Sequence, residues 1–341
     1  MKILFIGGTG TISMAISRLL LSLGHTLYLI NRGNRNTGLS GDLVELTVDI
    51  NDEAAAARLI QDLDFDVAAD FIAFTPSALE RDYRLLRGKT RQFIFISSAS
   101  AYQKPLSDYR ITEGTPLSNP YWEYSRNKIA CEDYLMRLYR EDGFPVTIVR
   151  PSHTYDERSV PLGVHGDMGS YSVIRRMREG KSVIIHGDGT SLWTLTHNSD
   201  FARAFVGLVG NIHAIGEAVQ ITSDESVTWN QIYQIIADAL HVKLNALHVS
   251  SEFLDACGGY DFAGSLLGDK ANTVVFDNSK LKRLVPDFTA TVRADEGIRS
   301  TVDYVLSHPE CQREDPAFDS WCDRVELALK EAARRVREMQ S

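Results

Sequence analysis

The chain has 341 residues, 44% hydrophobic and 24% charged, with a formal net charge of −9 at pH 7. This length suits one large domain with an added lobe, or two domains, and the acidic balance disfavours nucleic acid and anionic membranes as partners. The N-terminal MKILFIGG has no cleavage-like region after it and no stretch approaches 18 apolar residues, so we expect a cytoplasmic protein that does not span a membrane.

Cysteine usage gives no sign of a metal centre. The four cysteines have neither CxxC spacing nor a partnered histidine, so we predict no metal site and no disulfide framework. They are Cys131, Cys257, Cys311 and Cys322.

The first 150 residues alternate between predicted strands and helices. Continuous apolar runs predict buried strands, and apolar residues at helical spacing predict the helices between them. The predicted strands are 2–8, 26–33, 43–50, 66–74, 91–98 and 144–152, and the predicted helices are 11–25, 54–63, 76–88 and 121–135. This alternation predicts an α/β fold with a doubly wound parallel sheet, a Rossmann domain.

After Pro151 the alternation stops, which predicts a smaller α/β lobe. Helical spacing recurs at 171–180, 199–211, 229–240 and 279–285, and strands are expected at 182–189 and 218–222. The final stretch, 319–340, predicts an amphipathic helix with a solvated charged face. We assign 1–152 to the dinucleotide-binding domain, with returning segments near 195–224 and 276–306, and 153–194 and 225–341 mainly to a substrate lobe.

The motif with the clearest mechanics is GGTGTIS, Gly7 to Ser13, between the first strand and the first helix. Gly7 and Gly10 suit a tight turn whose backbone approaches a pyrophosphate at a helix N-terminus. Ser13 stands where a third glycine is common, and its small side chain preserves close packing. The alternative is a glycine turn without a ligand.

Cofactor type is read from the end of the second strand, LINRGNRN, which carries no carboxylate. Asn31, Arg32 and Arg35 favour NADP over NAD, because arginine accommodates the extra phosphate. The alternative is a solvated basic loop. Asp49 and Ile50, after the third strand, suit contact with adenine.

Tyr124 and Lys128 share one helix face, four residues apart. Such a pair is either an exposed surface pair or an acid/base catalyst with a neighbouring lysine that lowers its pKa. Ser98, at the end of a predicted strand, is either a turn cap or a hydroxyl that orients a substrate.

Together, GGTGTIS, VDI (48–50), DFIAF (70–74), FISSASAY (95–102), YSRNK (124–128) and RPSHTYDER (150–158) resemble an extended short-chain dehydrogenase/reductase of the NAD-dependent epimerase/dehydratase family. The resemblance implies that Tyr124 is the acid/base, that Lys128 favours its phenolate and contacts ribose, and that Ser98 orients the substrate oxygen. It further implies cofactor contacts at Thr9, Thr11, Ile12 and Phe71, substrate contact at Ser100, and a homodimer as the family's frequent form.

The sequence departs from nucleotide-sugar enzymes of this family at several positions. Ala99, Ser100 and Ala101 follow Ser98, where dehydratases carry an acidic pair. Trp193 and Leu266 stand where epimerases bring arginines to the diphosphate, which weakens a nucleotide-sugar reading unless Arg158, Arg175 or Arg176 substitutes.

Two histidines and one tryptophan in these segments leave alternatives open. Trp193 is either a stacking platform for a sugar ring or a core residue. His153 replaces a common asparagine and is either a substrate contact or a structural histidine. His197 matches a common family histidine and is expected to be structural.

We therefore predict an NAD(P)-dependent epimerase or oxidoreductase that acts on a sugar-like hydroxyl or keto substrate. The alternative is a non-catalytic protein of the same superfamily, associated with RNA or sensing a cofactor. The net charge of −9 and the lack of a dense stripe of Lys and Arg disfavour RNA as a partner. A sensor without catalytic activity is disfavoured because Ser98, Tyr124 and Lys128 occupy all three catalytic positions. The substrate, the choice between epimerase and reductase, and the oligomeric state stay open.

Overall fold

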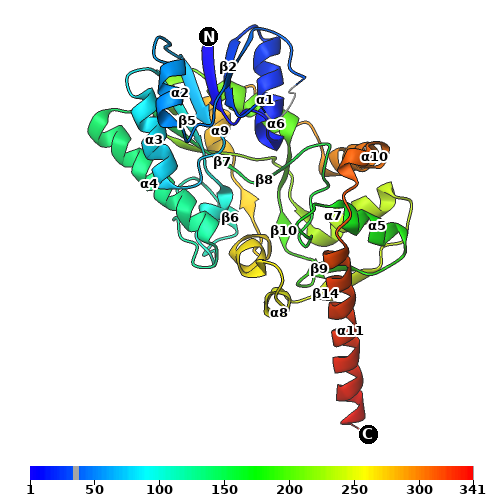
Figure 1. Ribbon diagram of the computed structural model, residues 1–341. Coiled ribbons are helices and arrows are strands. Elements are labelled where there is room, and N and C mark those ends of the chain that lie inside the picture. Colours follow the sequence, from blue (N-terminus) through cyan, green and yellow to red (C-terminus); the bar gives the residue numbers. More distant parts are fainter. Residues whose placement is uncertain (34–37, 341) are drawn as a thin grey trace. The chain divides into compact units, whose positions relative to one another are not determined.

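The computed structural model describes residues 1–33 and 38–340, whose contacts divide the chain into two compact units. The first unit contains Met1–Thr154, Thr196–Asp224 and Phe276–Thr291. The second contains Tyr155–Leu195, Glu225–Val275 and Val292–Ser341. Figure 1 labels the elements of both units. The assignment of cofactor and substrate roles to two domains stays a prediction.

A seven-stranded sheet forms the centre of the first unit in the described part of the chain, with the strand order β12-β7-β5-β4-β1-β2-β3. Every pairing within it is parallel. The strands are β1 (Lys2–Ile6), β2 (Thr26–Asn31), β3 (Leu43–Thr47), β4 (Val67–Asp70), β5 (Phe93–Ile96), β7 (Val146–Pro151) and β12 (Ala218–Ile221). The predicted doubly wound α/β fold is confirmed.

The apolar strands are explained by helices on both faces of the sheet (Figure 1). On one face, α1 (Thr11–Ser22) and α6 (Asn198–Leu208) pack on Ile3 and Phe5 of β1. On the other, α2 (Glu53–Leu59), α3 (Pro76–Leu86) and α4 (Glu123–Asp142) cover Leu4, Phe93 and Phe95. A strand buried on both faces loses the alternation of polar and apolar residues, as β5 with its sequence FIFI does.

Strand order reverses beside β1, because the chain runs from β1 to β2 and β3 on one side and then to β4, β5 and β7 on the other. In open parallel sheets, ligands bind outside the carboxyl ends of the strands at such a reversal. The loops after β1 and β4 meet at this place. Shorter elements complete the unit: η1 (Ala99–Ala101), β6 (Arg110–Ile111), β8 (His153–Tyr155), β11 (Leu195–His197), η2 (Ile212–Ala214) and α9 (Ser279–Leu284).

The second unit is mainly helical, around a core that contains Trp229, Tyr233 and Trp193. Its strands are β9 (Val183–His186) with β14 (Ala246–Val249), β10 (Leu192–Trp193) with β13 (Val227–Thr228), and β15 (Val275–Phe276). Its helices are α5 (Tyr171–Arg178), α7 (Trp229–Ala239), α8 (Ser251–Ala256), the π-helix η3 (Ala263–Lys270), α10 (Ala294–Ser307), η4 (Pro309–Cys311) and α11 (Pro316–Glu338). The expected helices at 171–180, 229–240 and 319–340 are confirmed, whereas α8, η3 and α10 are not among the predicted elements.

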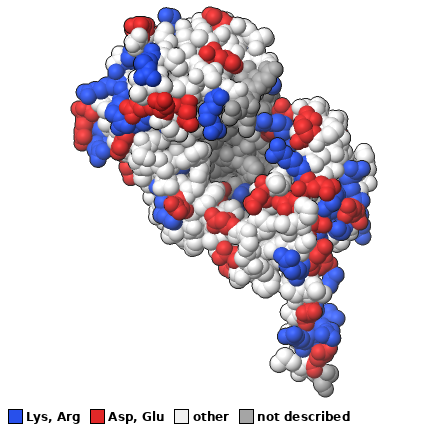
Figure 2. Space-filling view, in the orientation of Figure 1, with Lys and Arg blue, Asp and Glu red and all other residues white. Residues whose placement is uncertain are grey.

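Charge is mixed on the surface. Lys and Arg alternate with Asp and Glu over the face drawn in Figure 2. Within residues 1–33 and 38–340, no helix combines the length and the hydropathy that crossing a bilayer requires.

Candidate functional site

The glycine turn after β1 is a tight loop held from within. Gly7 has φ +82°, and a Cβ added there would stand 2.4 Å from Cγ2 of Ile72, so only glycine fits. Gly10 is the N-cap of α1, the kind of helix N-terminus at which anions bind. The N–H of Gly7 donates to the Ile30 carbonyl at 3.2 Å, which ties the turn to β2.

Two serines of α1 bind this loop. The Ser13 hydroxyl accepts a hydrogen bond from the Gly10 N–H at 2.8 Å and donates to the Gly7 carbonyl at 3.1 Å. The Ser17 hydroxyl donates to the Gly8 carbonyl at 3.2 Å. Ser13 therefore holds the turn by hydrogen bonds as well as allowing close packing. Sequence reasoning did not single out Ser17, although it lies one turn after Ser13 on the helix face that packs on the strand.

A pocket of about 590 Å³ opens over this turn in the first unit. It gathers the ten predicted cofactor-binding residues outside the Tyr124 helix, which are Gly7, Thr9, Gly10, Thr11, Ile12, Asn31, Arg32, Asp49, Ile50 and Phe71. Further lining residues are Ser13, Ile30, Val48, Asn51, Ile72 and Ile96. The shape and the glycine turn fit a dinucleotide, and the individual contacts stay predictions.

The loops after β2 and β3 are fixed by their own side chains. The Asn31 Oδ1 accepts from the Gly33 N–H at 2.8 Å, and the Asp49 Oδ1 accepts from the Asn51 N–H at 2.9 Å. Arg32 is exposed at the pocket wall, so it offers a cation to an adenosine phosphate. Arg35 lies outside the described residues, and the preference for NADP stays a prediction.

The side chain of Lys128 reaches the end of the sheet at β4 and β5. Tyr124 lies one turn earlier on the same helix, α4. The Lys128 Nζ donates to the carbonyls of Ala73 at 2.8 Å, in the loop after β4, and of Ile96 at 2.7 Å, the last residue of β5. Its Nζ lies 5.8 Å from the centroid of the Tyr124 ring, which also packs against Phe74 and Trp122. Burial lowers the pKa of the Lys128 ammonium to about 8. The pair is therefore no exposed surface pair.

Three serine hydroxyls form a chain beside this helix. The Ser125 Oγ donates to the Ser100 Oγ at 2.7 Å, and the Ser100 Oγ lies 2.9 Å from the Ser98 Oγ. The Ser98 Oγ also accepts from the Ser100 N–H at 3.1 Å. Asn119 Nδ2 donates to the Ser100 carbonyl at 2.8 Å. Ser100 is buried, which favours a supporting role for it in place of the predicted substrate contact.

A buried ion pair joins the same helix to the sheet. Glu132, one turn after Lys128, accepts from Arg150 Nη2 and Nε at 2.5 and 2.9 Å and from the Ser97 hydroxyl at 2.5 Å. Ser97 directly precedes Ser98, so this pair fixes the strand end that carries the site. Sequence reasoning missed Glu132 and Arg150, although the i, i+4 series 124, 128, 132 was visible.

The comparisons with known proteins decide the family. The sequence model of the NAD dependent epimerase/dehydratase family matches residues 3–222, which is more than half of the chain. The chain belongs to the NAD-dependent epimerase/dehydratase family. This membership agrees with the resemblance drawn from the motifs.

Within this family the chain is similar to proteins of different activities. It is 23% identical to 2'-dehydrokanamycin reductase of Streptomyces kanamyceticus, over 84% of this chain and 80% of the relative. It is 28% identical to an uncharacterized UDP-glucose epimerase of Bacillus subtilis, over 70% of this chain and 68% of the relative. The structure of UDP-glucuronic acid 4-epimerase from Bacillus cereus, in complex with UDP-glucuronic acid and NAD, has a TM-score of 0.71 at 21% identity, covering 90% of this chain and 99% of that one. This last likeness shows the fold.

The family's substrate positions in the second unit are occupied by packed or paired residues. Trp193 is 3% exposed and packs against Trp229 with ring centroids 5.5 Å apart, which favours a core residue over a stacking platform for a sugar. Leu266 is fully buried in η3. Arg158 donates from Nε to the Asp156 carboxylate at 2.9 Å, and its side chain is still 44% exposed.

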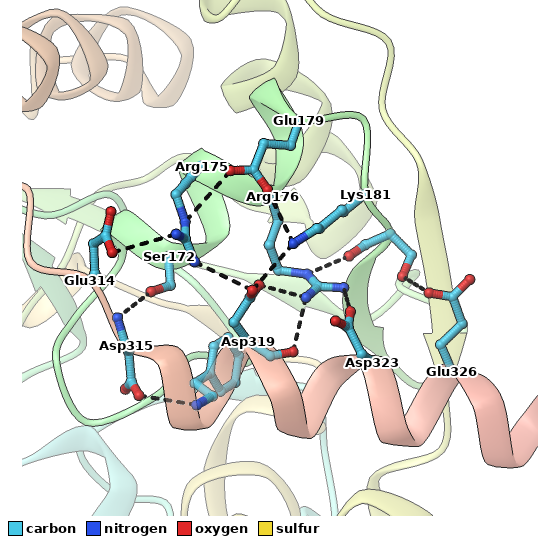
Figure 3. Close-up of polar contacts among 12 residues, drawn as sticks. Ser172, Arg175, Arg176, Glu179, Lys181, Glu314, Asp315, Asp319, Asp323 and Glu326 are labelled. Carbon is cyan, nitrogen blue, oxygen red and sulfur yellow. Dashed lines mark hydrogen bonds and ion pairs between the residues drawn. The ribbon is translucent and has the colours of Figure 1, made fainter.

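Helix α11 engages both Arg175 and Arg176 (Figure 3), which disfavours them as substitutes for the arginines expected at Trp193 and Leu266. Arg176, 1% exposed, forms ion pairs with Asp319 at 2.6 Å and Asp323 at 2.7 Å. Arg175 reaches Asp319 at 3.3 Å and Glu314 at 3.5 Å. These cations join α5 to α11, so of the three substitutes only Arg158 still offers an exposed guanidinium.

The structure gives different information on the two histidines that the sequence singled out. His197 is the N-cap of α6 and its Nδ1 accepts from the Ser199 N–H at 3.3 Å, which fits the expected structural role. His153 lies in β8 and is half-buried; its substrate role stays a prediction. Among the described residues, no group of three His, Cys, Asp or Glu side chains is arranged to hold a metal ion.

Proposed function

We propose that this chain is an NAD(P)-dependent oxidoreductase or epimerase that transfers hydride at a sugar or sugar-like hydroxyl or keto carbon, with Tyr124 as the acid/base. The observation that carries the proposal is the buried ammonium of Lys128 beside the Tyr124 ring. Both residues lie near the strand ends at which the pocket over the glycine turn opens. A bound nicotinamide would supply or accept the hydride.

In the reductive direction, Tyr124 would give its phenol proton to the carbonyl oxygen as the carbon takes up the hydride that a bound reduced nicotinamide would supply. The products would be an alcohol and a tyrosinate, which would regain its proton from solvent. A phenol has an ordinary pKa near 10, so a neighbouring cation is needed to favour the phenolate. Lys128 supplies that charge, and the Ser98 hydroxyl orients the substrate oxygen.

For the cofactor we propose NADP ahead of NAD, with Arg32 as the cation at the adenosine phosphate. For the substrate we propose a keto or hydroxy sugar without a nucleoside diphosphate. Support comes from Trp193 and Leu266 at the expected arginine positions, and from the engagement of Arg175 and Arg176 by α11. The similar reductase is named for a dehydro-aminoglycoside, a substrate of this kind.

The first test is to denature the purified protein, identify any released nucleotide by mass spectrometry, and titrate the emptied protein with NAD and NADP forms. An empty protein that binds NADPH supports a reductase with an exchangeable cofactor. Tightly held, stoichiometric NAD supports an epimerase that recycles its hydride and removes the preference for NADP. Binding of neither dinucleotide would end the enzyme proposal.

Turnover is then measured with two probes, UDP-glucose and 2'-dehydrokanamycin with NADPH. Tyr124→Phe is expected to lower turnover by about 10² to 10⁴-fold while the cofactor still binds, because the ring stays and only the proton is lost. Tyr121→Phe, just before the same helix and exposed, is the matched control and is expected to keep wild-type turnover. Equal turnover in Tyr124→Phe and Tyr121→Phe would remove Tyr124 from the mechanism.

A further inference from the structure

A cluster of buried charged side chains lies behind one wall of the pocket, and the proposed mechanism does not use it. Asp70 ends β4, and Arg81 and Asp82 lie on α3. The two carboxylates are fully buried and Arg81 is 8% exposed. Two carboxyl groups with one guanidinium are costly to bury, so their placement beside a ligand pocket calls for a reason beyond stability.

Asp70 shapes the loop that follows β4. Its Oδ1 accepts from the Ile72 N–H at 2.5 Å and from the Ala73 N–H at 2.7 Å. Ile72 is the residue that closes on Gly7, and the Ala73 carbonyl accepts from Lys128 Nζ. One carboxylate therefore fixes a loop that touches both the glycine turn and the lysine of the Tyr124 helix.

Arg81 connects the cluster by a hydrogen bond to Asn51, at the other end of the pocket. Its Nη1 donates to the Asn51 Oδ1 at 2.9 Å, and Asn51 lines the pocket next to Asp49 and Ile50. Its Nε and Nη2 donate to the Asp82 Oδ1 at 2.9 and 2.7 Å, and Nη2 lies 3.5 Å from the Asp70 Oδ2. The guanidinium thus balances the buried charge of Asp70.

We propose that Asp70 is a positioning residue for the dinucleotide: by holding the N–H groups of Ile72 and Ala73 it fixes the wall Phe71–Ala73, whose Phe71 and Ile72 line the pocket in which the cofactor would lie. This inference rests on the proposed function. Asp70 acts through Ile72 and Ala73 and need not touch the cofactor, because the hydrogen bonds of a charged acceptor hold backbone amides more firmly than neutral ones do.

Asp82 offers a matched control in the same cluster. Its Oδ1 accepts from Arg81 Nε and Nη2, and it shares a side-chain hydrogen bond with Asp70, but none of these bonds reaches the wall Phe71–Ala73. Burial, and then the charge of Asp70, raise the pKa of Asp82 well above its usual range, so a neutral amide is a close substitute for it. Asp70→Asn keeps an oxygen for the two amides but loses the charge that strengthens those bonds and faces Arg81.

The experiment measures the dissociation constants of NADH and NADPH by fluorescence titration, and those of ADP and 2',5'-ADP by calorimetry, for the wild type, Asp70→Asn and Asp82→Asn. We expect Asp70→Asn to weaken the tighter dinucleotide by about tenfold or more and to change the adenosine fragments by less than about twofold. Asp82→Asn is expected to leave every dissociation constant within about twofold. The difference between fragment and dinucleotide is a readout that general loosening of the fold would not produce.

The outcomes separate this inference from the proposed function. A wild type that binds neither dinucleotide would overturn both. A wild type that binds one, with Asp70→Asn binding equally well, would overturn the inference alone, as would equal losses for fragments and dinucleotide. If Asp70→Asn does not fold by thermal unfolding, the exposed Ile72→Ala tests the same wall: unchanged dinucleotide affinity in that variant would contradict the proposal.

Discussion

At the scale of single residues, Lys128 holds the fold together at the place where we propose that it acts on Tyr124. Two of its three N–H groups bind carbonyls, one in the loop after β4 and one at the last residue of β5, so it fixes α4 to the sheet. One donor remains for a phenolate or a ribose hydroxyl. The sequence pattern predicts its place beside Tyr124 but does not predict the two carbonyl contacts.

Lys128 is expected to titrate near pH 8, well below an ordinary lysine. Burial penalises the charged ammonium, so the pKa moves down, and above that pH the neutral amine no longer favours the Tyr124 phenolate. The measurement is an NMR titration of ¹³C-labelled lysine side chains, with Lys128→Arg to assign the signal. A Lys128 signal that titrates at 10.5 would refute the predicted burial effect.

The Ser125 hydroxyl donates to the Ser100 Oγ, and either hydroxyl of the Ser98–Ser100 pair can be the donor in the next bond. The proposed mechanism requires Ser100 to donate to Ser98, because the Ser98 proton is then available to a substrate oxygen. We expect Ser125→Ala to lower the rate of hydride transfer by about tenfold, the value of one hydrogen bond, with cofactor affinity unchanged. Ser125→Thr keeps the hydroxyl and should restore the rate; failure of that rescue would show that packing, not the hydroxyl, was lost.

At the scale of elements, two glycines of the turn after β1 belong to the same sequence motif but differ in how well they would tolerate a side chain. Gly7 has a positive φ and contacts Ile72, whereas an added Cβ at Gly10 would meet only the Ser13 Oγ, at 3.6 Å. Gly7→Ala is therefore expected to lower the free energy of unfolding by about 1–3 kcal/mol, and Gly10→Ala by much less. Urea unfolding of the two variants checks this, and equal losses would contradict the geometry.

The link between α5 and α11 depends on Asp319, which bonds Arg175, Arg176 and Lys181. Removing Asp319 leaves the buried Arg176 with Asp323 as its one ion-pair partner, so Asp319→Ala is expected to cost unfolding free energy at or below the lower end of about 3–5 kcal/mol. Glu338→Ala, which breaks the exposed Arg334–Glu338 pair, is the control on the same helix and should change it by less than about 0.5 kcal/mol. Denaturant unfolding of both variants compares them.

These elements also show what sequence patterns can and cannot predict. The strands of the first unit, the glycine turn and the Tyr124 helix depend on neighbours within a few residues, so local spacing predicts them. The pairing of Arg176 with Asp319 spans 143 residues, and the Asp70–Arg81–Asn51 contacts join three separate elements. No local pattern predicts such contacts, which is why the sequence left the role of Arg175 and Arg176 open and did not point to Asp70.

At the scale of the whole molecule, the net charge of −9 and the mixed surface charges (Figure 2) bear on partners. Binding to nucleic acid draws its affinity from phosphate contacts with Lys and Arg. We expect no retention of RNA at about 0.15 M salt in a filter-binding assay, with a basic RNA-binding protein as the positive control. Retention that falls steeply with added salt would instead support the RNA-associated alternative.

The first unit is assembled from three separate stretches of chain, and this order affects synthesis. Strand β12 closes the sheet beside β7, and α6 covers the face that α1 shares, yet both lie after residue 195. A nascent chain released after Thr154 would hold six of the seven strands with β7 as an open edge, the kind of edge that pairs with other chains. Completion of the seven-stranded sheet on the ribosome therefore waits for the emergence of Ile221, and premature termination before it is expected to yield aggregating fragments.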